Sequence, residues 1–99
     1  MVARGEFMFK SVQTRDKGNF TDKSTGEVIV YKSCNVLICD EIMSDGKGKE
    51  RKFKFPLENK ALLNDFQGLN PYTRVILEFD VSIYTSNAKV EPIRIVEIK

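Results

Sequence analysis

Apolar and polar side chains alternate along most of this 99-residue chain, and the alternation predicts strands. Successive side chains of a strand point to opposite faces, so one apolar face is typical of a strand that borders a core. Segments with this pattern occur at residues 6–15, 27–40, 51–57, 73–84 and 89–98. The second segment exceeds the usual strand length of about five or six residues, so we expect it to bend or bulge and join two sheets.

One segment has helical spacing instead. Its apolar side chains are Ala61, Leu62, Leu63 and Phe66. Asn59 suits the start of a helix and Gly68 its end, so the pattern predicts a helix over residues 59–67. A helix this short is stable only when it packs against other elements. Turn-forming residues predict a loop or wide hairpin at 16–26 and a hairpin tip at 44–49.

The predicted elements follow the order β-β-β-α-β-β. Five strands with one short helix between the third and fourth strands are typical of the OB-fold, a partly open Greek-key barrel. A β-grasp arrangement, in which the helix follows two strands, is the second choice. The chain is long enough for one core but short for two, so we expect a single OB-fold domain over residues 1–99.

The composition argues against several kinds of chemistry. The chain has no histidine, which excludes Ser-His-Asp and Cys-His catalysis and histidine-containing zinc sites. Cys34 and Cys39 lack the spacing of metal ligands and would point to opposite faces of one regular strand, so we expect reduced thiols without a disulfide. We therefore predict a non-catalytic protein without metal, cofactor or small-molecule substrate.

Hydropathy adds an expectation about location. No apolar run approaches the roughly 18–20 residues that a membrane helix needs, and the N-terminus lacks the apolar stretch of a signal peptide. We therefore expect a cytoplasmic protein that does not span a membrane.

Charge is distributed unevenly although the net charge is only +2, from 16 Lys and Arg against 14 Asp and Glu. Residues 1–60 carry 12 basic and 9 acidic side chains, whereas residues 61–99 carry 4 and 5. Within residues 47–54, five basic side chains accompany one acid. The surplus thus lies on the first three predicted strands, which in an OB-fold contribute to the nucleic-acid groove. An equally open interpretation is that these lysines protect an edge strand against aggregation.

Some aromatic residues fit a core less well than others. Phe7 or Phe9 suits the core, and so do Phe53, Phe55, Phe66 and Phe79. Phe20 lies in a polar loop, Tyr31 lies opposite the face of Val28 and Val30, and Tyr84 lies at a hairpin. An exposed ring beside lysine can stack on a base for about 1–3 kcal/mol. Partial burial with one wet edge is the alternative for each ring.

These two observations define a candidate nucleic-acid site. The bases would stack on Phe20, Tyr31 and Tyr84. The phosphates would contact Arg15, Lys17, Lys23, Lys32, Arg51, Lys52, Lys54 and Arg94.

Parts of the chain resemble a known family. Tyr72-Thr73-Arg74-Val75, the run Phe79-Asp80-Val81-Ser82-Ile83-Tyr84 and Ile93-Arg94-Ile95-Val96 are similar to the C-terminal half of the filamentous-phage gene V type of single-stranded DNA-binding protein. The stretch from Gly26 through Tyr31 to Cys39 is similar to that family's DNA-binding strand. The resemblance implies a five-stranded barrel, a symmetric homodimer and cooperative coating of single strands. It also implies that Tyr84 stacks on a base and that Tyr31 or Lys32 contacts DNA.

We therefore expect an OB-fold protein that binds single-stranded DNA, with RNA as a possible ligand, during replication of a phage or mobile element. The alternative is a protein-interaction or assembly module, in which the strand at 51–57 adds to the edge of a partner's sheet.

Overall fold

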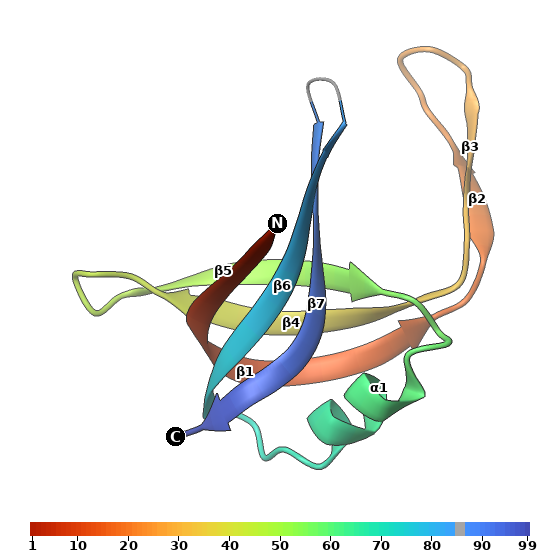
Figure 1. Ribbon diagram of the computed structural model, residues 1–99. Coiled ribbons are helices and arrows are strands. Elements are labelled where there is room, and N and C mark those ends of the chain that lie inside the picture. Colours follow the sequence, from red (N-terminus) through yellow and green to blue (C-terminus); the bar gives the residue numbers. More distant parts are fainter. Residues whose placement is uncertain (85–86) are drawn as a thin grey trace.

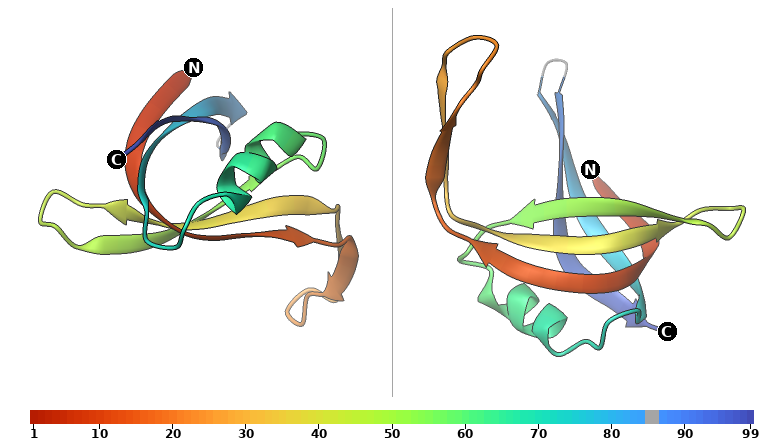
Figure 2. Two further views of the ribbon diagram at one scale, coloured as in Figure 1. Left: turned by 90° about the horizontal axis from the view of Figure 1, so that it is seen from below. Right: turned by 180° about the vertical axis from the view of Figure 1, so that it is seen from behind.

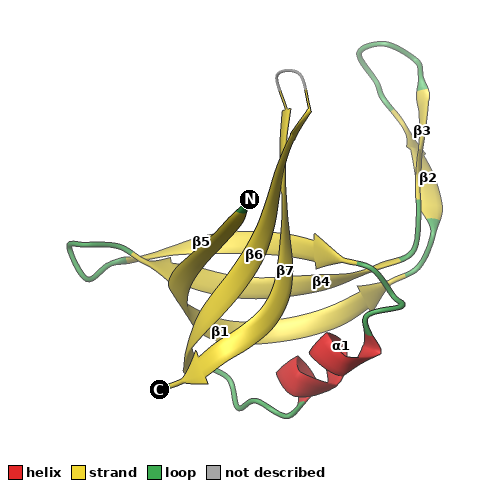
Figure 3. Cartoon of the chain, viewed as in Figure 1, coloured by secondary structure: helices red, strands yellow, loops and turns green. Residues whose placement is uncertain are grey.

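The computed structural model describes residues 1–84 and 87–99, and the side chains of Tyr31, Ile83, Tyr84 and Asn87 lie outside this description. The chain is mostly strand with one short helix (Figures 1 and 3). The strands and the helix are β1 (Val2–Arg15), β2 (Gly18–Thr21), β3 (Val28–Tyr31), β4 (Cys34–Ile42), β5 (Gly48–Phe55), α1 (Lys60–Gln67), β6 (Arg74–Tyr84) and β7 (Asn87–Ile98). Among the described residues, no helix is long and apolar enough to cross a membrane.

A five-stranded antiparallel sheet forms the body, in the order β5-β4-β1-β6-β7. The central strand β1 pairs with two neighbours: residues 2–8 pair with β6, and residues 7–15 pair with β4. The register of β1 against β4 shifts between Phe9 and Ser11, which makes Lys10 a bulged residue. A bulge increases local twist, and Figure 2 shows how the sheet curls around the core.

The sheet does not close into the expected barrel. Strands β5 and β7 end the sheet order, and although they approach each other, no ladder joins them in the described part of the chain. The register of β7 against β6 shifts twice, leaving Ile93 and Val96 without a partner residue, and Pro92 has no amide proton. Pro92 cannot donate a ladder hydrogen bond, which suits a strand at the edge of a sheet. The five-stranded antiparallel sheet and the short helix are confirmed, whereas β5 and β7 do not close the sheet into a barrel.

The expected loop or hairpin at residues 16–26 is part of a second, two-stranded sheet. Strands β2 and β3 pair antiparallel and project from the body on the same side as the described ends of β6 and β7 (Figures 1 and 2). The strand expected over residues 27–40 is divided into β3 and β4, with Lys32 and Ser33 between them. This long segment therefore does join two sheets, as its length indicated.

The core lies inside the curled sheet, against α1. Its buried members are Phe7, Phe9, Leu37, Cys39, Phe55, Leu62, Phe66, Val75, Leu77 and Phe79. The phenylalanines expected in the core are confirmed, with Phe53 partly buried against it. Helix α1 packs against β1 and β7, and its first turn is capped by the Asn59 side chain, which accepts a hydrogen bond from the Leu62 amide at 3.3 Å. The predicted helix and its cap are confirmed.

One buried polar side chain links three parts of the sheet. Asn35, at the start of β4, is fully buried. Its Oδ1 accepts a hydrogen bond from Thr14 Oγ1 at 2.8 Å, and its Nδ2 donates to the Pro56 carbonyl at 3.2 Å. Asn35 thereby holds the segment after β5 against β4 and β1.

We expect Asn35→Ala to lower the free energy of unfolding by about 1–3 kcal/mol, because it removes two part-buried hydrogen bonds that connect β4 to β1 and to the segment after β5. Urea unfolding followed by circular dichroism measures the change. Asn19→Ala, at an exposed position of β2, is the control and should change stability by less than about 0.5 kcal/mol. An equally small effect at Asn35 would contradict the proposed linking role.

Candidate nucleic-acid interface

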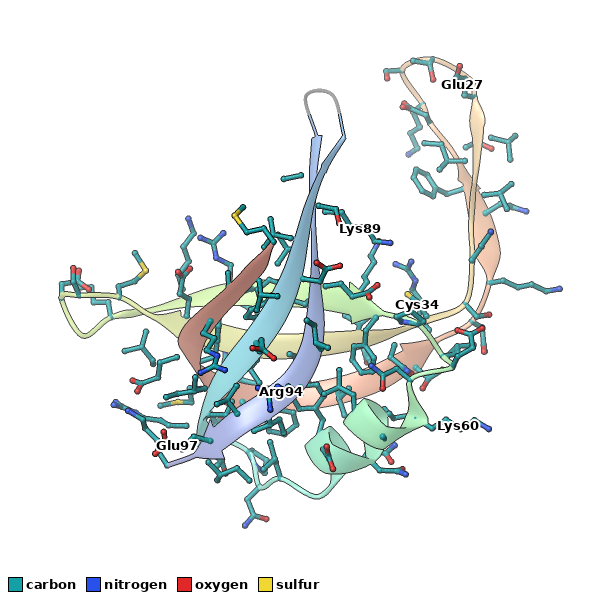
Figure 4. All side chains as sticks on the ribbon, viewed as in Figure 1. Glu27, Cys34, Lys60, Lys89, Arg94 and Glu97 are labelled. Carbon is teal, nitrogen blue, oxygen red and sulfur yellow. The ribbon has the colours of Figure 1, made fainter. Side chains whose placement is uncertain are left out.

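A hollow lies where the β3–β4 junction, the end of β5 and the first half of β7 meet. Its volume is about 310 Å³. It is lined by Lys32, Ser33, Cys34, Lys54, Phe55, Pro56, Lys89 and Glu91, and we call it the lysine hollow. Figure 4 labels Cys34 and Lys89, which come from separate elements on the same side of the body.

The local structure explains how these side chains meet. Strand β5 alternates, so that Phe55 is buried in the core while Lys54 is exposed. Asn35 binds the Pro56 carbonyl and so fixes the end of β5 beside Cys34. Lys32 lies at the break between β3 and β4, and the pairing of β7 with β6 brings Lys89 to the same hollow.

The hollow is positively charged. Lys32, Lys54 and Lys89 face one acid, Glu91, which gives its side chains a net charge of +2. Lys89 Nζ lies 3.9 Å from Glu91 Oε1, but the lysine side chain is 69% exposed, so this ion pair is weak. Within the described residues, Lys32 and Lys54 are in no recorded ion pair. Three ammonium groups around a partly apolar surface are suited to a phosphate-bearing ligand.

Two of these three lysines were predictable from the sequence. Lys32 and Lys54 were candidate phosphate ligands, and the structure brings them together. Lys89 was missed, because it lies in the half of the chain with a net negative charge and only sheet pairing brings it to the hollow. Lys52 shares the exposed face of β5 with Lys54, since both alternate with core-facing phenylalanines.

On the β2–β3 hairpin, the structure separates the expected ring from one of its expected lysines. Phe20 is 53% exposed and pairs with Ile29, so these two side chains share one face. Lys17 precedes β2 by one residue and, by alternation, belongs to the opposite face. Lys23 lies in the turn at the tip. Phe20 and Lys17 therefore do not form a joint platform within one copy.

The predicted arginines are engaged elsewhere. Arg51 Nε donates to Glu41 Oε2 at 2.9 Å, and Arg15 is half-buried. Arg94 donates to Glu78, which also accepts from Arg4 at 3.2 Å. These hydrogen bonds, the one from Arg94 first, lower the pKa of Glu78, and the same contact raises the pKa of Arg94. A phosphate would have to compete with these carboxylates for Arg51 and Arg94.

The structure does not describe the side chains of Tyr31 and Tyr84, the two tyrosines proposed for stacking. The backbone of Tyr31 pairs with Gly18, and that of Tyr84 pairs with Asn87. Their roles as base contacts stay predictions.

The two cysteines differ in their surroundings. Cys39 is fully buried in the core, and burial, followed by the nearby Asp40 and Glu41 carboxylates, raises the pKa of its thiol to about 12. Cys34 is half-buried and lines the lysine hollow. Cys34 is therefore a natural reporter on the hollow.

We expect iodoacetamide at pH 8 to alkylate Cys34 in the native protein and to leave Cys39 unmodified, since the reactive species is the thiolate and Cys39 is both inaccessible and protonated. Mass spectrometry of proteolytic peptides measures both sites. In denaturant both thiols should react, which serves as the control. Native modification of Cys39 at the rate of Cys34 would contradict this arrangement.

No family model, curated protein or solved structure matches this chain.

Proposed function

We propose that this chain is a non-catalytic OB-fold protein that binds single-stranded DNA, with the lysine hollow as the centre of its binding surface. As the sequence resemblance implies, it would coat unpaired strands during replication of a phage or mobile element.

The position of the lysine hollow is the observation that carries this proposal. In an OB-fold, the second and third of the five strands, and the loops after the first and fourth, bind oligonucleotides. In this chain those strands are β4 and β5, and those loops are the segment containing β2 and β3 and the connection between β6 and β7. The hollow borders this set, because its lining comes from the β3–β4 junction, the end of β5 and the first half of β7.

The chemistry suits a ligand with a phosphate backbone and no fixed sequence. Lys32, Lys54 and Lys89 would displace condensed counterions from phosphates. Phe20, Tyr31 and Tyr84 would offer ring faces to unpaired bases, a contact that tolerates any base. Phosphate contacts and base stacking are available to both DNA and RNA, so single-stranded RNA is a competing ligand in the test.

Fluorescence anisotropy with labelled oligo(dT) at two salt concentrations tests the proposal. Three neutralised phosphates predict a slope of about −2 for log K against log salt, from about −0.7 per phosphate on single strands. Double-stranded DNA and RNA of the same length are the comparison ligands. Saturating oligo(dT) should also slow the alkylation of Cys34. Absence of binding at low salt, a salt-independent affinity or unchanged Cys34 reactivity would each overturn the assignment.

A second candidate function rests on the open edge of β5. This strand ends the sheet order, so its outer backbone groups have no ladder partner among the residues that the structure describes. A partner's extended segment could add to that edge, as the sequence alternative supposes. Oligonucleotide titration separates the two functions, since a folded chain without affinity for single strands at low salt would favour the edge-pairing function.

A further inference from the structure

The β2–β3 hairpin exposes apolar side chains on both of its faces. Phe20 (53% exposed) and Ile29 (39%) pair across one face, whereas Val28 (62%) and Val30 (75%) lie on the other. None of the four belongs to the core cluster. A two-stranded ribbon alone is marginally stable in water, and contiguous exposed apolar side chains often mark a contact surface.

Charge differs between these two faces. The Asp22 amide donates to the Glu27 carbonyl at 2.8 Å, so the ladder continues by one pair beyond Thr21 and Val28. By alternation, Glu27 shares the face of Phe20 and Ile29, which we call the phenylalanine face. The carboxylate of its partner Asp22 lies at the same tip and accepts hydrogen bonds from the amide and hydroxyl of Ser24 at 2.8 and 2.7 Å.

The opposite face is basic. Lys17 and Lys32 flank the last pair at the base of the hairpin, Gly18 with Tyr31, and the Lys17 amide donates to Ser33 Oγ at 2.9 Å across the same end. By alternation these lysines share the side of Val28 and Val30, which we call the valine face. One ribbon thus carries an aliphatic, basic face and an aromatic, acidic face.

We propose that the valine face of one copy of this chain docks on the phenylalanine face of a second copy. The acids lie at the hairpin tip, where Figure 4 labels Glu27, and by the order of pairs the lysines lie at its base, so their charges meet when the two hairpins run antiparallel. The two faces differ, so the contact is heterologous and can repeat from copy to copy, instead of closing into a twofold dimer. This inference does not rest on the proposed function, and a docked copy would compete with an unpaired base for the Phe20 ring.

The contact is small, which sets the concentration at which it forms. Stable interfaces bury roughly 800 Å² per partner, and one face of a ribbon made of two short strands offers much less. We therefore expect weak association, with a dissociation constant of roughly 0.1–1 mM. Sedimentation velocity of the intact protein without nucleic acid should show a mass that keeps rising with concentration.

Substitution of the valine face tests the contact directly. Val28→Thr with Val30→Thr keeps the β-branched shape but removes apolar surface, and it should weaken self-association at least fivefold. Val2→Thr with Ile98→Thr changes two side chains of similar exposure, 60% and 59%, outside the hairpin and should leave association unchanged.

A charge exchange distinguishes this docking from nonspecific hydrophobic association. Lys17→Glu and Glu27→Lys should each weaken self-association, since each places like charges opposite one another across the contact. An equimolar mixture of the two variants should associate more strongly than either variant alone.

Several outcomes would overturn the inference. One is a protein that stays monomeric up to about 1 mM at low salt, and another is a dimer whose mass does not rise further with concentration. The others are valine-face variants that self-associate as strongly as the intact protein, and a mixture of the charge variants that associates no more strongly than either variant alone. Self-association is measured without nucleic acid, whereas oligo(dT) affinity is measured by anisotropy at nanomolar protein, so failure of this inference is distinguishable from failure of the proposed function.

Discussion

Replacing Phe66 by alanine should lower the free energy of unfolding by about 3–5 kcal/mol, the largest stability loss that we expect from one substitution. Phe66 is fully buried and comes from α1. Its ring is stacked on Phe9, with the centroids 5.9 Å apart, and tilted against Phe55 at 5.8 Å. Removing the ring leaves a cavity between the helix and the sheet that the surrounding aromatic side chains cannot fill.

The loss should extend beyond the cavity itself. Helix α1 has only eight residues, so it depends on packing for its stability. Single domains are stable by about 5–15 kcal/mol, and this substitution therefore removes a large share of the total. Urea unfolding followed by far-ultraviolet circular dichroism measures the change.

Phe20→Ala is the matched control, because it removes the same ring from an exposed position on the β2–β3 hairpin. We expect that variant to lose less than about 1 kcal/mol. Equal losses at the two positions would mean that α1 does not dock through Phe66.

Replacing Lys32, Lys54 and Lys89 together by alanine should lower the affinity for oligo(dT) on the order of 10²-fold at 50 mM salt, if the proposed function is correct. Each phosphate contact contributes about −0.7 to the salt slope, so the slope of log K against log salt should become shallower by about 2. Anisotropy titrations at several salt concentrations give both quantities.

The control for this variant removes the same number of charges elsewhere. Lys47, Lys49 and Lys60 are exposed and do not line the hollow. Their triple alanine variant has the same net charge as the hollow variant and should retain most of the salt slope. Equal weakening by both variants would show that net charge, and not the hollow, determines binding.

Local pattern explains how much of this fold was predictable. The alternation around Phe53 and Phe55 predicted β5 and its exposed lysines, and helical spacing with an Asn59 cap predicted α1, because both depend on neighbouring residues only. The start of β1 was missed. Residues 2–5 are strand because they pair with β6, more than seventy positions away, and their own sequence does not alternate clearly.

The candidate site was predictable only in part, for the same reason. Lys32 and Lys54 belong to the basic first part of the chain, and counting charges indicated them. Lys89 and the buried Asn35 bridge depend on contacts between distant segments, and no local signal marks them. The arginines Arg51 and Arg94 looked available in the sequence, whereas their acidic partners come from neighbouring strands.

The amino-acid order alone therefore determined most of the five strands in the main sheet, the helix and the phenylalanine core, since these follow from the two- and 3.6-residue periods of backbone geometry. The tertiary structure decided which strands are neighbours, that the sheet stays open between β5 and β7, and that three lysines from separate strands and loops meet. Those outcomes depend on burial and hydrogen bonding between segments far apart in the chain, which no local period encodes.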